Sequence, residues 1–338
     1  MPDLTYAYAN ARIKGMETEL LTSEKYRNLY NVESIPEMTA MLQETAYRDA
    51  MIQASKDFHG VELILVGLQK NWLNTLAKLE RILPEKAKEA FSVMVGEWEV
   101  QDVKSIISKR ALGGNASIEE LVNATPQSRR LNEKLLAAKT WEDTLNVLHG
   151  TAYWRKSRSF KQEQDRLLKD RDYRALATTL DRAQVERVMA FSKTAKRKTT
   201  RKLLAEKTEL TNTLMVLRLK SFATRDQIEN QLIGPASARV KALLDSKDLD
   251  AAVNLLALPE DVINAYQHKK TLSTLEMALE KAFVERVLRT FRTTVLSFGV
   301  VLGFLYLKSA EVNNLKRLAL GKHFGVEEDM KQFLYVLG

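Results

Sequence analysis

The chain has 338 residues and a net charge of +9 at pH 7, so it is long enough for two or three domains of ordinary size. Its 13 glycines and 6 prolines argue against a turn-rich β protein, and its many Leu, Ala, Glu, Lys and Arg residues favour helices. The sequence contains no cysteine, which excludes disulfide bonds, thiolate metal sites and cysteine nucleophiles.

The first third of the chain reads as a series of helices. The pattern predicts an amphipathic helix over residues 4–22 and a short helix that begins at Ser23. Ser34 is predicted to cap the next helix, because a hydroxyl followed by an acid in the first turn satisfies free backbone N–H groups there. The N-terminus has neither a basic nor an apolar signal region, so no signal peptide is expected.

The middle third contains a long stretch without Gly or Pro, from Thr151 to Lys220, which predicts two long antiparallel helices with a turn near Lys193. The densest basic part of the chain, residues 155–202, lies inside it. Nucleic acid, an anionic membrane surface and an acidic protein face are all compatible partners, and a solvated helix face with interspersed acids is the fourth interpretation. The candidate basic face consists of Lys193, Lys196, Arg197, Lys198 and Arg201.

The last third contains an uncharged run from Thr293 to Leu307. A bilayer-spanning helix needs about 20 residues, so we interpret this shorter run as a helix that is buried in protein on all sides. Gly325 breaks the pattern, and a final short helix is predicted over residues 326–337. No segment of useful length alternates with period two, so the fold class predicted is all-α.

A twelve-residue pattern occurs three times: an acid, an amide or second acid, an apolar residue and a base, at offsets 0, +3, +7 and +11. These offsets lie along one line of a helix, because one turn takes about 3.6 residues. An apolar stripe at offsets +1 and +8 runs beside each line. The polar members are Glu99, Asp102 and Arg110 in the first copy, Glu209, Asn212 and Lys220 in the second, and Glu311, Asn314 and Lys322 in the third. Lys316, beside the line of the third copy, is a further candidate residue of the same network.

A second series of markers agrees with this count. Ser34, Thr140 and Ser246 are spaced 106 residues apart, and each is predicted to cap a helix. We therefore predict three helical repeats, residues 1–112, 113–222 and 223–338. A short helix follows each motif and has a counterpart near Ser23. The N-terminus is therefore expected to provide the short helix that lies beside the C-terminal copy. Three such units fit a closed ring or funnel better than an open solenoid.

The sequence offers no sign of catalysis or of a cofactor. No phosphate-binding glycine loop occurs, and the four histidines, His59, His149, His268 and His323, are too far apart in sequence to form a pair of metal ligands on one helix. Catalysis normally needs one asymmetric site, so a threefold carboxylate indicates either a structural network or a surface for a partner. The aromatic residues in the basic stretch have the spacing of a helix core, which disfavours nucleic acid.

Three short motifs resemble those of the C subunit of archaeal and bacterial A/V-type ATPases, whose counterpart in the eukaryotic vacuolar enzyme is the d subunit. They are Tyr8-Ala9-Asn10-Ala11-Arg12-Ile13-Lys14, Glu44-Thr45-Ala46-Tyr47, and Glu311-Val312-Asn313-Asn314-Leu315-Lys316-Arg317 with Gly321-Lys322. The middle copy departs from the family pattern, because Thr213-Leu214 stands where the third copy has Leu315-Lys316.

The resemblance implies an all-helical funnel of three similar domains without an active site. Such a protein sits on the cytoplasmic face of the cell membrane, where it joins the central shaft subunits of the D and F type to the proteolipid rotor ring. It transmits torque between ATP turnover and ion transport, and contact with the membrane surface is compatible with the positive charge. The alternative from another class is a basic helical-repeat protein that binds nucleic acid or acts as an adaptor.

Overall fold

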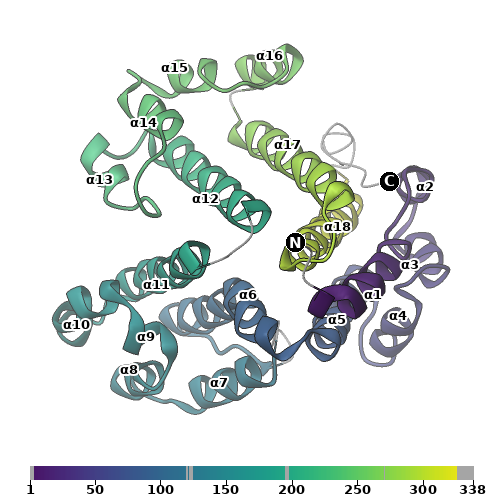
Figure 1. Cartoon of the computed structure of the whole chain (residues 1–338), viewed down its shortest axis with the longest axis horizontal. Coiled ribbons are helices and arrows are strands. Elements are labelled where there is room, and N and C mark those ends of the chain that lie inside the picture. Colours follow the sequence, from purple (N-terminus) through teal and green to yellow (C-terminus); the bar gives the residue numbers. More distant parts are fainter. Residues whose placement is uncertain (1–3, 119–120, 122–124, 195–197, 270, 326–338) are drawn as a thin grey trace. The chain divides into compact units, whose positions relative to one another are not determined.

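The computed structural model describes residues 4–118, 121, 125–194, 198–269 and 271–325 (Figure 1). Every regular element in these ranges is a helix, and they contain no strand. The predicted all-α class is therefore confirmed. None of the helices in the described ranges is both long and apolar enough to cross a bilayer. The helix predicted over 326–337 lies outside these residues, as does most of the short segment that follows Ser117.

The chain divides into two compact units. Unit 1 contains residues 1–75, 197–232 and 236–338, and unit 2 contains residues 76–196 and 233–235. Unit 1 thus combines the first and last parts of the chain. This division follows packing rather than internal similarity, so the three repeats with boundaries at 112 and 222 stay a prediction.

Unit 1 is built around three long helices that pack on one another, α12 (Lys198–Leu219), α17 (Leu272–Thr293) and α18 (Phe298–Phe324). The N-terminal helices α1 (Ala7–Glu17) and α3 (Ile35–Gln43) pack against α18. The other elements of the unit are η1 (Leu4–Tyr6), α2 (Ser23–Asn31), α4 (Arg48–Ala54), the first part of α5 (Gly60–Ile82), α13 (Arg225–Glu229), α14 (Ala238–Asp245), α15 (Leu249–Asn254) and α16 (Glu260–Lys269).

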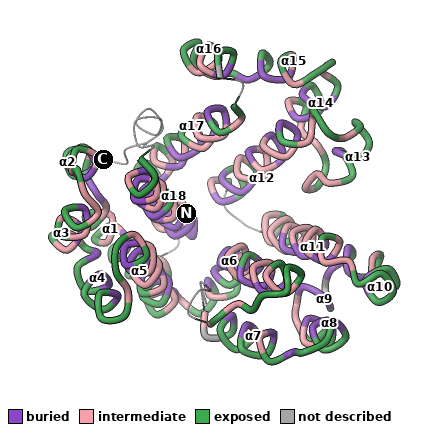
Figure 2. The backbone as a smooth tube through the Cα atoms, turned by 180° about the vertical axis from the view of Figure 1, so that it is seen from behind, coloured by how far each residue is buried: buried purple, intermediate pink, exposed green. Residues whose placement is uncertain are grey.

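Helix α18 is the most deeply buried element of unit 1, and Figure 2 shows buried residues along much of it. It begins where the Ser297 hydroxyl accepts a hydrogen bond from the Gly299 N–H, and it ends at Gly325, which has a positive φ of 68°. A Cβ at Gly303 would lie 2.9 Å from the Phe291 ring, so glycine is needed for α17 and α18 to approach this closely.

The uncharged run is only partly the buried helix that the sequence predicts. From Phe298 to Leu305 every residue is buried, as expected. Before that point the run forms an elbow, because α17 ends at Thr293, Val295 is 69% exposed and Leu296 has a φ of 47°. Hydropathy alone does not reveal this elbow, since its residues are as uncharged as the helix that follows.

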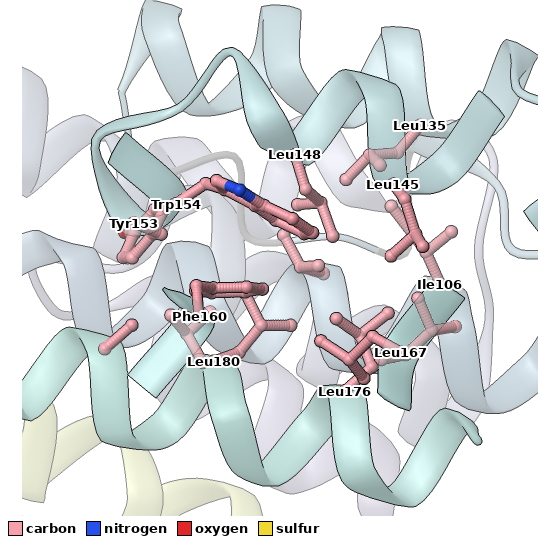
Figure 3. Close-up of a cluster of buried hydrophobic side chains, with 14 of the residues drawn as sticks. Ile106, Leu135, Leu145, Leu148, Tyr153, Trp154, Phe160, Leu167, Leu176 and Leu180 are labelled. Carbon is pink, nitrogen blue, oxygen red and sulfur yellow. The ribbon is translucent and has the colours of Figure 1, made fainter. Parts of the chain in front are cut away.

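Unit 2 is built on α6 (Glu85–Ala111) and α11 (Tyr173–Thr194), which pack along each other. Figure 3 shows its core, where Leu148 and Leu180 lie next to the rings of Trp154 and Phe160, and Leu176 lies next to Leu167. The Trp154 and Phe160 rings stack at 4.6 Å between centroids. The remaining helices are the end of α5, α7 (Pro126–Ala137), α8 (Trp141–His149), α9 (Ala152–Lys156) and α10 (Arg158–Asp170).

The stretch from Thr151 to Lys220 contains four helices rather than the two predicted. The extra breaks need no Gly or Pro: the Ser157 hydroxyl accepts from the Phe160 N–H to start α10, and Arg171 ends α10 with a φ of 50°. The expected helix end near Lys193 is confirmed, because α11 ends at Thr194.

Two of the three predicted caps are confirmed, and the third is wrong. The hydroxyls of Ser34 and Thr140 accept hydrogen bonds from Glu37 N and Asp143 N, as N-caps do. Ser246 instead follows α14, where its hydroxyl donates to Leu243 O, and Asp248 caps α15. The aspartate competes better for the N-cap position, since its carboxylate accepts strongly from the Ala251 N–H.

Candidate functional site: the three motif copies

The third motif copy contains a buried charged cluster inside unit 1. Glu311 is completely buried, and its carboxylate accepts hydrogen bonds from Leu21 N at 2.6 Å, Tyr47 Oη at 2.7 Å and Lys308 Nζ at 2.8 Å. Lys308 Nζ also donates to Tyr47 Oη at 2.9 Å. Burial, and next the charge of Glu311, raise the pKa of Tyr47 well above its usual range, so the phenol stays a donor. The cluster therefore ties Leu21 and Tyr47 to α18.

The same copy also holds the end of an N-terminal helix. Lys322 Nζ donates to the carbonyl oxygens of Tyr30 at 2.6 Å and Val32 at 2.5 Å, at the C-terminus of α2. These carbonyls have no partner inside α2, and a cation stabilises them. Asn314 is fully buried on the same face, and Lys316 is half-buried, so that burial lowers the pKa of its ammonium group.

The first copy makes the equivalent contacts within unit 2. Ser128 Oγ donates to the Glu99 carboxylate at 2.6 Å, and Asn132 Nδ2 donates to the buried Asp102 at 2.9 Å. Arg110 donates to Leu135 O near the C-terminus of α7 and to Thr144 Oγ1 on α8, both at 2.8 Å. The first copy therefore joins α6 to α7 and α8.

Of the acids in the three copies, Glu209 of the second copy makes the weakest contact. Glu209 faces Arg239 at 3.7 Å, a looser contact than the hydrogen bonds of Glu99 and Glu311. Asn212 is buried at the next turn. Lys220 Nζ donates to the carbonyl oxygens of Leu243 at 3.0 Å and Leu244 at 2.6 Å, in the last turn of α14, and burial lowers the pKa of this lysine.

The three bases share one structural role. Arg110, Lys220 and Lys322 each donate to backbone carbonyls at the end of a short helix, α7, α14 and α2 respectively. The short helix follows the motif in the first two copies, whereas in the third it comes from the N-terminus. The expectation that the N-terminal segment lies beside the C-terminal copy is thus confirmed within unit 1.

The opening motif binds the elbow before α18. Asn10 accepts from Ser297 N at 2.8 Å and donates to Ser297 O at 3.3 Å, and both groups are buried. Lys14 Nζ donates to Phe291 O at 3.2 Å and lies 3.6 Å from the centroid of the Phe291 ring. The N-terminal helix therefore holds both sides of the turn between α17 and α18.

Nearly the whole chain matches a family described as "ATP synthase (C/AC39) subunit", with residues 9–333 aligned. The chain belongs to this family. The expected resemblance is therefore confirmed, and the chain is a subunit of a rotary ATP synthase.

Curated relatives of this family align with the chain over most of their length. The C subunit of the A-type ATP synthase of Thermococcus onnurineus is 27% identical over 96% of this chain and 88% of the relative. The protein of the same name from Desulfurococcus sp. is also 27% identical, over the same shares of the two chains. That of Thermococcus kodakarensis is 26% identical over 97% of this chain and 90% of the relative.

Two residues of this network are not among the acids, amides and bases of the three motif copies, although Tyr47 ends the Glu44-Thr45-Ala46-Tyr47 motif. The first is Lys308. It is a single lysine in an apolar run and lies three residues before Glu311, and this pattern indicates a buried ion pair. The second is Tyr47. Its equivalent in the first copy, Tyr153, lies close to Glu99, and burial followed by that carboxylate raises the pKa of Tyr153 as well. The second copy has a proline, residue 259, at this position, so Glu209 has no tyrosine partner there.

Among the described residues of the candidate basic face, none has a hydrogen bond or ion pair to the motif residues. Lys193, Lys198 and Arg201 are exposed, Lys193 in unit 2 and the other two in unit 1. Lys196 and Arg197 lie outside the residues whose side chains the structure describes. The described part of the chain contains no group of three or more His, Asp or Glu residues that could hold a metal ion.

Proposed function

We propose that this chain is the non-catalytic central-stalk subunit that joins the shaft of an A-type rotary ATP synthase to its membrane ring. Its partners would be shaft subunits of the D and F type on one side and the proteolipid ring on the other. It would act at the cytoplasmic face of the membrane as a peripheral protein, and this role needs no cofactor. The family match over residues 9–333 is the observation that carries this proposal.

The motif network supports a mechanical role. A part that carries torque has to resist relative movement of its helices. Close packing transmits strain, and buried polar networks with all their hydrogen bonds made add rigidity. Glu311 alone links Leu21, Tyr47 and Lys308. We further propose that the three repeats form a funnel around an axis, and that Glu99, Glu209, Glu311 and their motif partners keep the repeats stiff.

Assembly tests this proposal. The tagged chain, expressed with shaft and proteolipid ring subunits, is expected to purify with both at physiological ionic strength. A form of the chain without residues 1–31 is the matched comparison, and it should lose this assembly because α18 then lacks its partners from α1 and α2. Salt-dependent binding to duplex DNA or RNA, together with no binding to shaft subunits, would favour the nucleic-acid alternative instead.

A further inference from the structure

A cavity of about 400 Å³ opens inside unit 1 where the first turns of α12 approach the elbow between α17 and α18. The close approach is visible at Gly299, where a Cβ would lie 3.3 Å from the Thr199 methyl group. Most of the lining residues carry an amine or a hydroxyl, and they include Lys198, Thr199, Lys202, Thr290, Thr294 and Ser297. The cavity is therefore polar and rich in hydrogen-bond donors.

The ionisable side chains that line the cavity are both cationic. Lys198 is exposed and has no ion-pair partner among the described residues, and Lys202 reaches Glu206 only at 3.8 Å with 64% of its side chain exposed. The Thr199 hydroxyl also lines the cavity. Two ammonium groups and a hydroxyl can thus donate to an anion there.

The distribution of acids along the sequence reinforces this charge. No Asp or Glu occurs between Glu186 and Glu206, and none occurs between Glu285 and Glu311. The cavity lies where the end of the first segment meets the middle of the second. Two exposed arginines, residues 289 and 292, lie in the last turns of α17 beside the threonines that line the cavity. The nearest acid to Lys202 is Glu206 at 3.8 Å, and the described residues that line the cavity include basic side chains but no acid.

An exposed apolar side chain borders the same elbow. Val295, which lines the cavity, is 69% exposed. Basic residues beside an exposed apolar side chain are typical of surfaces that meet the boundary between lipid headgroups and acyl chains.

We propose that this cavity binds the phosphate of an anionic phospholipid headgroup, with Lys198 and Lys202 on the phosphate oxygens and Val295 at the edge of the acyl region. A soluble phosphate would use the two lysines but would gain nothing from the apolar border. The inference rests on the proposed peripheral contact with the membrane, and it adds the site and the chemistry of the ligand. Its test uses the isolated chain, so its failure is distinguishable from a failure of assembly with shaft subunits.

The test measures binding of the purified full chain to vesicles of phosphatidylcholine with and without phosphatidylglycerol, by co-sedimentation. Binding is expected only with the anionic lipid, and it should weaken as salt rises. Lys198→Gln with Lys202→Gln should weaken binding about 30-fold, since a basic residue near an anionic surface contributes about 1 kcal/mol and about 1.4 kcal/mol is tenfold. Val295→Ser should weaken it severalfold.

The matched control is Lys161→Gln with Lys169→Gln on α10, which removes the same charge from lysines that neighbour Glu163, Asp165 and Asp170. This control should change binding less than about threefold, because separated surface charges are screened. Unchanged helicity and melting temperature verify folding of each variant. An equal loss in both pairs would mean diffuse attraction and would overturn the proposal.

A titration with inorganic phosphate distinguishes a lipid headgroup from free phosphate as the ligand of the cavity. Calorimetric titration with inorganic phosphate at constant ionic strength is expected to show no binding that depends on Lys198 and Lys202. Binding of inorganic phosphate at these lysines without binding to anionic vesicles would assign the cavity to a soluble anion and overturn the lipid proposal. Absence of binding to the anionic vesicles would overturn it too.

Discussion

At the residue scale, the cluster of Lys308, Glu311 and Tyr47 shows how a buried charge becomes acceptable in a core. The Lys308 and Glu311 side chains are 5% and 0% exposed. The carboxylate has three donors, and the lysine has two acceptors. A buried ion pair is weak evidence for net stability, but the loss of one partner leaves an uncompensated charge. The cluster should therefore behave as a unit.

Substitution of Glu311 by Gln is expected to lower the free energy of unfolding by about 3–5 kcal/mol, because Lys308 then stays buried without a counter-charge. The double variant Lys308→Met with Glu311→Gln should lose less than the sum of the single losses. Urea unfolding measures the double variant and both single variants. The exposed pair Arg225–Glu229 is the control, where Glu229→Gln should cost less than about 1 kcal/mol. Additive losses at Lys308 and Glu311 would contradict the prediction.

The buried side chain of Tyr266 predicts how stability responds to alkaline pH. Tyr266 Oη donates to Asp250 at 2.9 Å, and burial followed by this hydrogen bond raises the pKa of Tyr266 to about 12. An unfolded tyrosine ionises near pH 10, so the stabilising contribution is complete below about pH 10 and is lost as pH rises to about 12. Chemical unfolding across this window should show stability falling with pH. Tyr266→Phe should flatten that fall, and an identical slope in the variant would refute the assignment.

At the element scale, the C-terminal end of a shorter helix repeatedly accepts hydrogen bonds from a basic side chain of a longer helix. Arg110, Lys220 and Lys322 each sit at or near the end of α6, α12 or α18 and reach carbonyls of a different helix. The long side chain places its ammonium or guanidinium group at the exposed carbonyls while its apolar stem stays packed. The repeat thus preserves a packing contact, which explains why the acid and the base keep their spacing.

Lys322→Met is expected to free the end of α2 and to speed hydrogen exchange in residues 23–33. The expected loss is about 1–2 kcal/mol, the contribution of a partly buried cation at a helix C-terminus. Hydrogen exchange followed by mass spectrometry measures this locally. Lys316→Met is the matched control, because Lys316 lies on the same helix, whereas the carbonyls at the end of α2 accept from Lys322. Equal changes in the two variants would show that Lys322 does not cap α2.

At the scale of the whole molecule, unit 1 joins the two ends of the described chain. Asn10 and Ser297 are 287 residues apart, and Lys322 and Tyr30 are 292 apart. Closing so long a loop costs chain entropy, and the buried hydrogen bonds between the ends offset that cost. Under the proposed function, this closure would let one polypeptide resist torsion from both of its partners.

The combined variant Glu99→Gln, Glu209→Gln and Glu311→Gln is expected to lower ion pumping per ATP hydrolysed in the assembled complex, or to loosen its assembly. The reason is that the acid of every motif copy loses charge-assisted contacts at once. Ion transport into vesicles and ATP hydrolysis measure the ratio. ATPase activity of the separated headpiece should stay unchanged, and a loss there would mean that these residues do not act in coupling.

The sequence by itself determined the helical class, the helix starts at Ser34 and Thr140, the threefold motif and the family, because periodicity and capping depend on residues only a few positions apart. It also indicated that the N-terminus complements the last motif copy. Only the tertiary structure decided that Lys308 and Tyr47 complete the Glu311 cluster, that Asp248 rather than Ser246 caps α15, and that an elbow at residues 294–297 interrupts the uncharged run. These features depend on packing between residues far apart in the chain, which no local pattern encodes.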